Sequence, residues 1–83
     1  MRTNTLVKIN KPVQTDDSTS DWIYLALHPV LEENTRQEAG RCKPGETGMV
    51  VKARQMMDGK FWYLVLLNTG ASGWLIENEI SEI

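Results

Sequence analysis

Residues 44–80 read PGETGMVVKARQMMDGKFWYLVLLNTGASGWLIENEI, and this stretch decides the fold. Apolar runs rich in β-branched and aromatic residues alternate in it with turn-forming residues. Asp58 and Gly59 lie between two such runs, and a tight hairpin turn favours Gly because Gly adopts a positive φ at little cost. The stretch therefore predicts a β-meander whose last tight turn, at residues 68–73, leads into a short closing strand ending at Ile80.

The length of the chain limits it to one small domain. With 83 residues, 41% of them hydrophobic and 24% charged, the composition is that of a globular protein with a small core. No apolar run approaches the ~20 residues that span a bilayer. Residues 1–5 show no apolar signal segment, and the single Cys42 cannot form an intrachain disulfide. We therefore expect a single cytoplasmic domain over residues 1–83, with no membrane partner.

The charge balance argues against nucleic acid as a partner. Nine basic and eleven acidic side chains give a net charge of −2, whereas nucleic-acid binding needs a clustered basic face. A small-barrel interface to nucleic acid, with Lys52, Arg54 and Lys60 facing the phosphates, is the alternative hypothesis.

The N-terminal half is less regular than residues 44–80. Residues 5–10 alternate like a strand, and residues 14–20 are polar turn formers typical of a loop. Residues 21–28 fit a buried strand or a helical turn by periodicity, and their aromatic content favours the strand. Residues 29–39 fit either one short polar helix, closed by Gly40, or an extended acidic loop.

The C-terminal half resembles an SH3-like barrel, a family of small five-stranded barrels used as interaction modules. The resemblance rests on the turn at residues 44–48, the turn before Phe61-Trp62-Tyr63, and the Gly-x-x-Gly-aromatic motif at residues 70–74. It is similar in pattern to bacterial SH3 domains. The resemblance implies a mainly β, five-stranded SH3-like barrel. The N-terminal residues add to it a long acidic loop and, as one of the two readings of residues 29–39, a short helix.

The resemblance does not extend to the ligand groove. SH3 domains that bind proline-rich peptides carry a proline and a tyrosine around the 3₁₀ turn, and the positions that match them here are Ile76 and Glu79. SH3 domains that bind cell wall belong to longer, exported proteins. We therefore expect a different protein ligand.

Catalytic groups are few. His28 is the only histidine, and no oriented partner for it is evident. Cys42 lies between two basic residues, which lower a thiol pKa, but no second cysteine or nearby histidine accompanies it. Zinc sites use about four Cys or His ligands, and no glycine-rich phosphate loop is present. We expect no enzyme activity, no metal, no cofactor and no small-molecule substrate.

The aromatic residues are the best candidates for function. They are too many for the interior of so small a barrel, and aromatic side chains dominate binding hot spots. We expect either Trp62 or Trp74 to be partly exposed and to anchor a partner, and we expect Leu64, Val65 or Leu66, Val50 and Ile80 to form the core. The hypothesis is a small protein-binding module, acting as an adaptor, accessory subunit or inhibitor of a larger protein. Its predicted partner-binding residues are Trp62, Trp74, Tyr24, Glu32, Glu33 and Met57.

Overall fold

The computed structural model describes residues 1–10, 22–32 and 35–83. These residues form a mainly β structure, which confirms the predicted class. In chain order the elements are β1 (Leu6–Ile9), β2 (Ile23–Ala26), β3 (Glu38–Cys42), β4 (Thr47–Gln55), β5 (Phe61–Leu67), β6 (Ser72–Ile76), the 3₁₀ turn η2 (Glu77–Glu79) and β7 (Ile80–Glu82). None of the helical segments described is long and apolar enough to cross a membrane.

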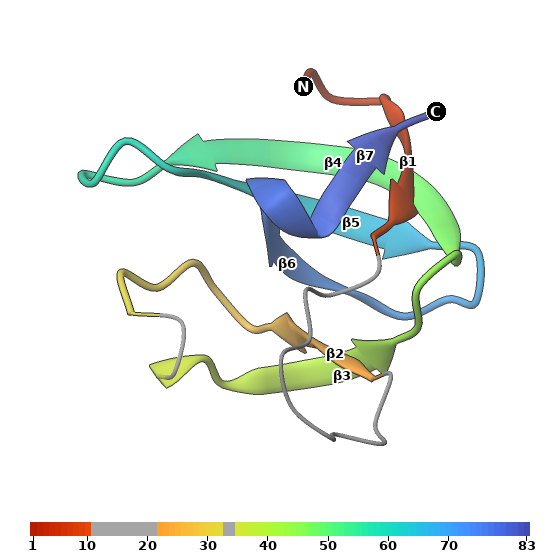
Figure 1. The fold of residues 1–83 in the computed structure, drawn as a ribbon, viewed down its shortest axis with the longest axis horizontal. Helices are drawn as coiled ribbons and strands as arrows, with labels where there is room; N and C mark the ends of the chain where they lie inside the picture. The colour runs from red at the N-terminus through yellow and green to blue at the C-terminus, as the bar shows by residue number, and fades with distance from the viewer. Residues whose placement is uncertain (11–21, 33–34) are drawn as a thin grey trace.

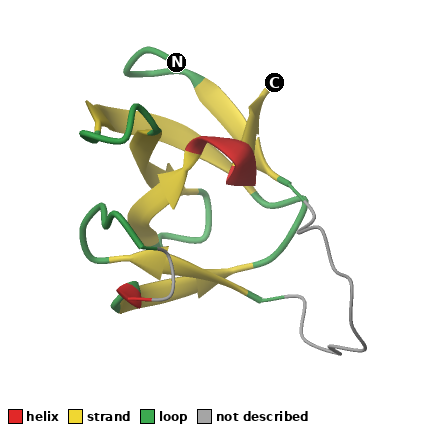
Figure 2. Cartoon of the chain, turned by 60° about the vertical axis from the view of Figure 1, so that its left-hand side comes forward, coloured by secondary structure: helices red, strands yellow, loops and turns green. Residues whose placement is uncertain are grey.

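All seven strands belong to one antiparallel sheet, in the order β3-β2-β6-β5-β4-β1-β7. The sheet bends so that β2 and β3 lie across from β4, β1 and β7 (Figures 1 and 2). The edge strands β3 and β7 do not pair with each other, so the sheet does not close. The prediction of a closed, five-stranded barrel is therefore wrong. Turn signals in the sequence indicate hairpins, but they do not reveal strands that join the sheet by pairing with distant segments.

The predicted hairpin turn connects β4 and β5. Gly59 has a φ of 87°, and its N–H donates to the Met56 carbonyl oxygen over 2.9 Å. The Asp58 carboxylate accepts a hydrogen bond from the Lys60 N–H over 3.0 Å. The side chain of Asp58 and the backbone freedom of Gly59 thus fix the turn together, as the sequence indicates.

The segment at residues 29–39 contains no α-helix in its described part. Glu38 and Ala39 instead begin β3, which pairs with β2 through contacts such as Tyr24 opposite Arg41. A short helix that buries no apolar face is marginal in water, whereas β2 offers a partner for the backbone of this segment. Of the two readings of residues 29–39, the described part therefore fits the extended one and not the helix. The polar loop predicted at residues 14–20 and the acidic residues 33–34 lie outside the described residues.

The main core lies on the concave side of the bent sheet. Val50, Val65 and Ile80 are buried in it, as predicted. Leu66 is 45% exposed and Leu64 is only half-buried, because alternation along β5 turns both toward the opposite face. The other buried members of the core are Val7, Ile9, Ile23, Leu25, Cys42, Tyr63, Leu67 and Leu75.

The chain reaches its last strand through η2. The Glu79 carboxylate turns back to accept a hydrogen bond from the Ile76 N–H over 3.0 Å, which satisfies a donor at the start of the turn. Strand β7 then pairs with β1, with Ile80 opposite Ile9. The closing strand therefore begins at Ile80 and does not end there.

Replacement of Ile80 by Ala tests the core. We expect this change to lower the free energy of unfolding by about 2–5 kcal/mol, because it leaves a cavity among packed side chains. The control is Leu66→Ala, which removes an exposed side chain and should cost less than about 1 kcal/mol. Urea titration of both variants checks the difference, and equal losses would contradict the assignment of the two faces of the sheet.

Candidate functional site

Two cross-strand rows of side chains lie on the convex side of strands β4, β5 and β6. In the first row Arg54 is opposite Trp62, and Trp62 is opposite Ile76. In the second row Lys52 is opposite Leu64, and Leu64 is opposite Trp74. Directly opposed residues project to the same side of a sheet. We call this surface the outer face, and it consists of Lys52, Arg54, Trp62, Leu64, Trp74 and Ile76, together with Leu66, which follows Leu64 on the same side of β5.

Trp62 is the centre of the first row, and it is buried. Its exposed fraction is 0%, and it packs with Ala26 and Ile76 in a second apolar cluster that Val30, Met56 and Trp74 border. Its Nε1 is the one buried side-chain nitrogen or oxygen in the described residues that has no hydrogen-bond partner. Trp62 thus acts in packing, and of the two tryptophans proposed as anchors only Trp74 is partly exposed.

Arg36 covers Trp62. Its guanidinium carbon lies 5.0 Å from the centre of the indole ring, a cation–π geometry. The same guanidinium contacts both carboxylate oxygens of Glu79 over 3.1 Å and donates to the Tyr24 carbonyl oxygen over 2.7 Å. The side chains of Arg36 and Glu79 are only 9% and 20% exposed. Sequence reasoning missed Arg36, because only the folded chain brings it to Trp62.

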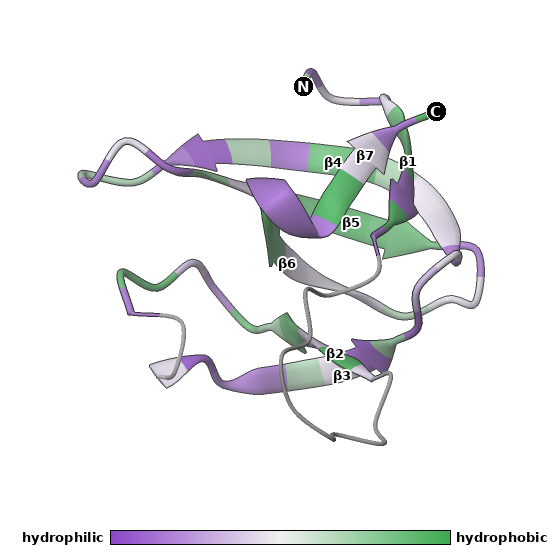
Figure 3. Ribbon diagram, viewed as in Figure 1, coloured by the Kyte–Doolittle hydropathy of each residue, from purple (hydrophilic) through white to green (hydrophobic). Residues whose placement is uncertain are grey.

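The accessible part of the outer face combines apolar and basic groups. Leu64 and Trp74 are half-buried, and Leu66, next along β5, is exposed. Lys52 and Arg54 border this strip as exposed side chains, and neither forms an ion pair with any residue that the structure describes. Hydropathy along β4 alternates toward the β4–β5 hairpin (Figure 3). The outer face is therefore an apolar strip with a basic border.

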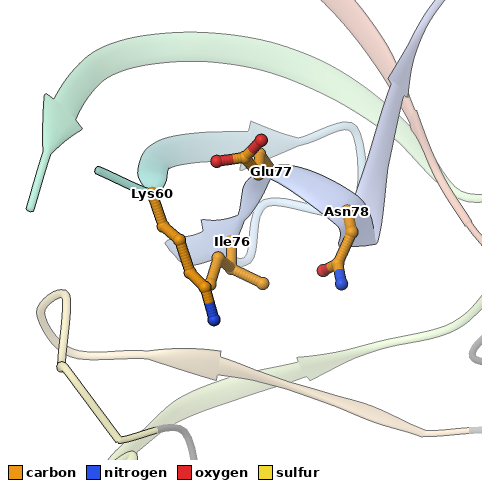
Figure 4. Close-up of a pocket in the computed structure, with 4 residues that line it drawn as sticks. All are labelled: Lys60, Ile76, Glu77 and Asn78. Atoms are coloured by element: carbon orange, nitrogen blue, oxygen red, sulfur yellow. The ribbon is translucent and has the colours of Figure 1, made fainter. Parts of the chain in front are cut away.

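A pocket of about 230 Å³ lies at one end of the outer face. Lys60, Ile76, Glu77 and Asn78 line it (Figure 4). The Lys60 side chain extends along Ile76, while the Glu77 carboxylate points away from the end of that side chain and accepts a hydrogen bond from the Phe61 N–H over 2.7 Å. The pocket thus offers an ammonium group, an amide and an apolar wall.

A second aromatic surface lies on the β2–β3 pair. The Arg41 guanidinium lies 5.4 Å from the centre of the Tyr24 ring, and the Lys43 ammonium lies 4.6 Å from that of Trp22. Arg41 also forms an ion pair with Glu38 over 3.3 Å. Both exposed rings therefore already have cations against them.

The structure brings only some of the predicted partner-binding residues together. Trp62 and Trp74 share the second apolar cluster, to which the side chains of Tyr24, Glu32 and Met57 do not belong. Met57 is 88% exposed beside the β4–β5 turn, and Glu32 is exposed in the segment after β2. Glu33 lies outside the described residues.

Cys42 and His28, the two candidate catalytic groups, contact backbone carbonyl groups. The Cys42 thiol is buried and donates to the Ile23 carbonyl oxygen over 3.5 Å. Burial first, and then the charges of Glu46 and Glu79, raise the pKa of this thiol from 9.0 to about 12. The His28 Nδ1 lies 3.3 Å from the carbonyl oxygen of Pro29. In the described ranges no three His, Cys, Asp or Glu side chains gather as metal ligands.

Comparison of the chain with protein families, with curated proteins and with solved structures finds no match.

The contrast between two arginines tests the packing of Trp62. Arg36→Ala should destabilise the fold by about 3 kcal/mol, because it leaves Glu79 and the Tyr24 carbonyl without their partner in a poorly hydrated place. Arg41→Ala breaks an exposed ion pair, whose side chains are 52% and 45% exposed, and should cost at most about 1 kcal/mol. Thermal and urea unfolding of both variants measures the difference. Equal stability of the two would show that Arg36 does not hold the fold.

The Cys42 thiol makes stability depend on pH in the alkaline range. Because the folded-state pKa of about 12 lies above the unfolded value of 9.0, the unfolded state loses its thiol proton first. The contribution of Cys42 to stability is therefore complete below pH 9.0 and decreases as the pH rises toward 12. We expect Cys42→Ala to lessen this decrease in urea titrations between those pH values. Fast reaction of the native thiol with Ellman's reagent at neutral pH would contradict the burial on which this prediction depends.

Proposed function

We propose that this chain is a non-enzymatic protein-binding module that acts as an adaptor, accessory subunit or inhibitor of a larger protein. The observation that carries the proposal is the outer face, where half-buried Leu64 and Trp74 and exposed Leu66 form an apolar strip bordered by cations. The strip lies on a sheet, so its side chains have fixed spacing before any partner arrives.

The composition of this strip is that of a protein-binding hot spot. A half-buried Trp offers a large contact area and loses little conformational freedom on binding, because its body is already packed. Trp74 packs against the cluster around Trp62 and is therefore held in place. Leu64 and Leu66 extend the apolar area, and the cations of β4 form the polar rim that surrounds such a centre.

The β2–β3 surface is the weaker candidate. Its two exposed rings, Trp22 and Tyr24, have cations close to them, so a partner would have to displace those contacts or bind around them. Arg41 there is also paired with Glu38. Lys52 and Arg54, in contrast, form no ion pair with a described residue, and a partner gains the full benefit of contacting them.

An SH3-like relationship and a cytoplasmic location are part of the same proposal. The tight turns at Gly45, Gly59 and Gly70, all with positive φ, and the 3₁₀ turn before the last strand support the relationship. The unpaired, buried Cys42 is compatible with a reducing compartment. The raised pKa of its thiol disfavours nucleophilic chemistry at neutral pH, which supports a role in binding.

A pair of tryptophan variants tests the proposed function. The parent protein is used to capture a partner from native host extract, and the affinity for the purified partner is then measured. Trp74→Ala should weaken binding by about 2 kcal/mol or more while the far-UV circular dichroism stays that of the parent. Trp62→Ala should lower the stability by about 3–5 kcal/mol, because it empties the second cluster.

Two further variants complete this test. Leu66→Ser removes an exposed side chain of the strip, and should weaken binding even if Trp74→Ala proves unstable. Tyr24→Ala is the matched control on the β2–β3 surface and should bind as the parent does. Parent-like binding by both Trp74→Ala and Leu66→Ser would refute the outer face as the partner site, and loss of binding in Tyr24→Ala alone would assign the site to β2–β3.

A further inference from the structure

Three basic side chains border the outer face, and the one acidic group of the pocket at its end, Glu77, accepts a hydrogen bond from the Phe61 N–H. Lys52 and Arg54 project from β4 on the same side as Leu64 and Trp62, and Lys60 lines the pocket beside Ile76, the residue opposite Trp62. These three basic side chains therefore border the same surface. None of them forms an ion pair with a residue that the structure describes, although the chain as a whole has a net charge of −2.

The basic and apolar side chains of the outer face are spaced at distances that an extended peptide can match. Lys52 and Arg54 are two residues apart on one strand, so their Cα atoms are about 7 Å apart. Strands β4, β5 and β6 are about 4.8 Å apart, so Leu64 and Trp74 lie roughly 5 and 10 Å from Lys52 across the sheet. Side chains that face one way in an extended segment repeat at about 7 Å. Acidic and apolar side chains on one such segment could thus reach a cation and the strip.

We propose that the outer face binds an extended acidic segment of the partner protein, in which apolar side chains lie among the carboxylates. This inference rests on the proposed function and names the chemistry of the partner. Carboxylates pair with Lys52 and Arg54, and one enters the pocket beside the Lys60 ammonium and the Asn78 amide. Apolar side chains lie on Leu64 and Trp74.

The same surface fits a nucleic acid less well. Single-stranded nucleic acids bind through aromatic rings on which bases stack, but Trp62 is fully buried and its ring faces Arg36. Three cations give at most about three phosphate contacts, whose binding falls steeply with salt. The apolar strip, finally, matches side chains better than phosphates.

The test titrates the ¹⁵N-labelled protein with three probes at low ionic strength. The probes are an acidic peptide of alternating Glu-Glu and Leu, the same peptide with Lys for Glu, and an oligothymidylate. We expect the acidic peptide alone to shift amide signals of β4, β5 and β6 around Lys52, Leu64 and Trp74. No shift with this peptide, shifts confined to β2 and β3, or tighter binding of the oligothymidylate would each overturn the proposal.

Two charge reversals of equal size give the matched control. Lys52→Glu with Arg54→Glu should weaken binding of the acidic peptide at least about tenfold. Arg41→Glu with Lys43→Glu changes the net charge by the same amount on the β2–β3 surface and should leave binding within about twofold. Equal weakening by both pairs would show a long-range charge effect and would overturn the assigned site.

The captured partner separates this inference from the proposed function. If Trp74→Ala weakens partner binding and Lys52→Glu with Arg54→Glu does not, the outer face binds a protein but not through acidic groups, so the inference fails and the function stands. If neither change affects a partner that binds the parent, both fail. If Trp74→Ala and Lys52→Glu with Arg54→Glu each weaken partner binding, and Arg41→Glu with Lys43→Glu does not, the result supports the proposed function and the acidic partner segment.

Discussion

The contact between Arg36 and Trp62 joins the segment after β2 to the C-terminal meander on the outer side of the sheet. The guanidinium stacks on the indole ring of β5, bonds to the backbone of β2 at Tyr24 and pairs with Glu79 of the 3₁₀ turn. Glu79 in turn caps the Ile76 N–H at the end of β6. Arg36 therefore contacts two elements of the C-terminal meander, β5 and η2, and is linked to β6 through Glu79. These contacts lie on the convex side of the sheet. The second apolar cluster lies on the same side, and Trp74 packs against it.

Local signals were enough to predict the meander but not the sheet. The turn at Asp58 and Gly59 depends on a side-chain acceptor and on positive φ, and both properties belong to the residues themselves. Residues 38–42 carry no comparable signal, since their strand exists only because β2 lies beside them. The sequence therefore left a helix and an extended segment open at residues 29–39. The strand count and the open edge likewise depend on pairings between distant segments, such as β1 with β7.

The candidate site could be predicted only as far as the alternation of side chains along a strand determines which residues share one face of the sheet. Strand periodicity places Trp62 and Leu64 on one side of β5 and Tyr63 and Val65 on the other. Periodicity cannot predict that the Trp62 side chain is covered, because the residue that covers it, Arg36, comes from a distant part of the chain. Sequence reasoning therefore singled out both Trp62 and Trp74 but could not say which one is exposed. It also placed Leu64 in the core, although Leu64 is only half-buried, and it left open whether Val65 or Leu66 is buried; the buried residue is Val65.

Burial of Trp62 changes what the outer face can recognise. An exposed indole would offer its ring face and its N–H to a ligand, whereas here the ring faces Arg36 and the N–H is enclosed. Trp62 thus contributes to folding, and the binding role that we propose falls to residues at the border of its cluster. Those residues are a half-buried Trp74, two leucines of β5 and the cations of β4. The partner that we propose therefore has to supply apolar area and negative charge together, because neither the short apolar strip nor the few exposed cations would provide much affinity alone.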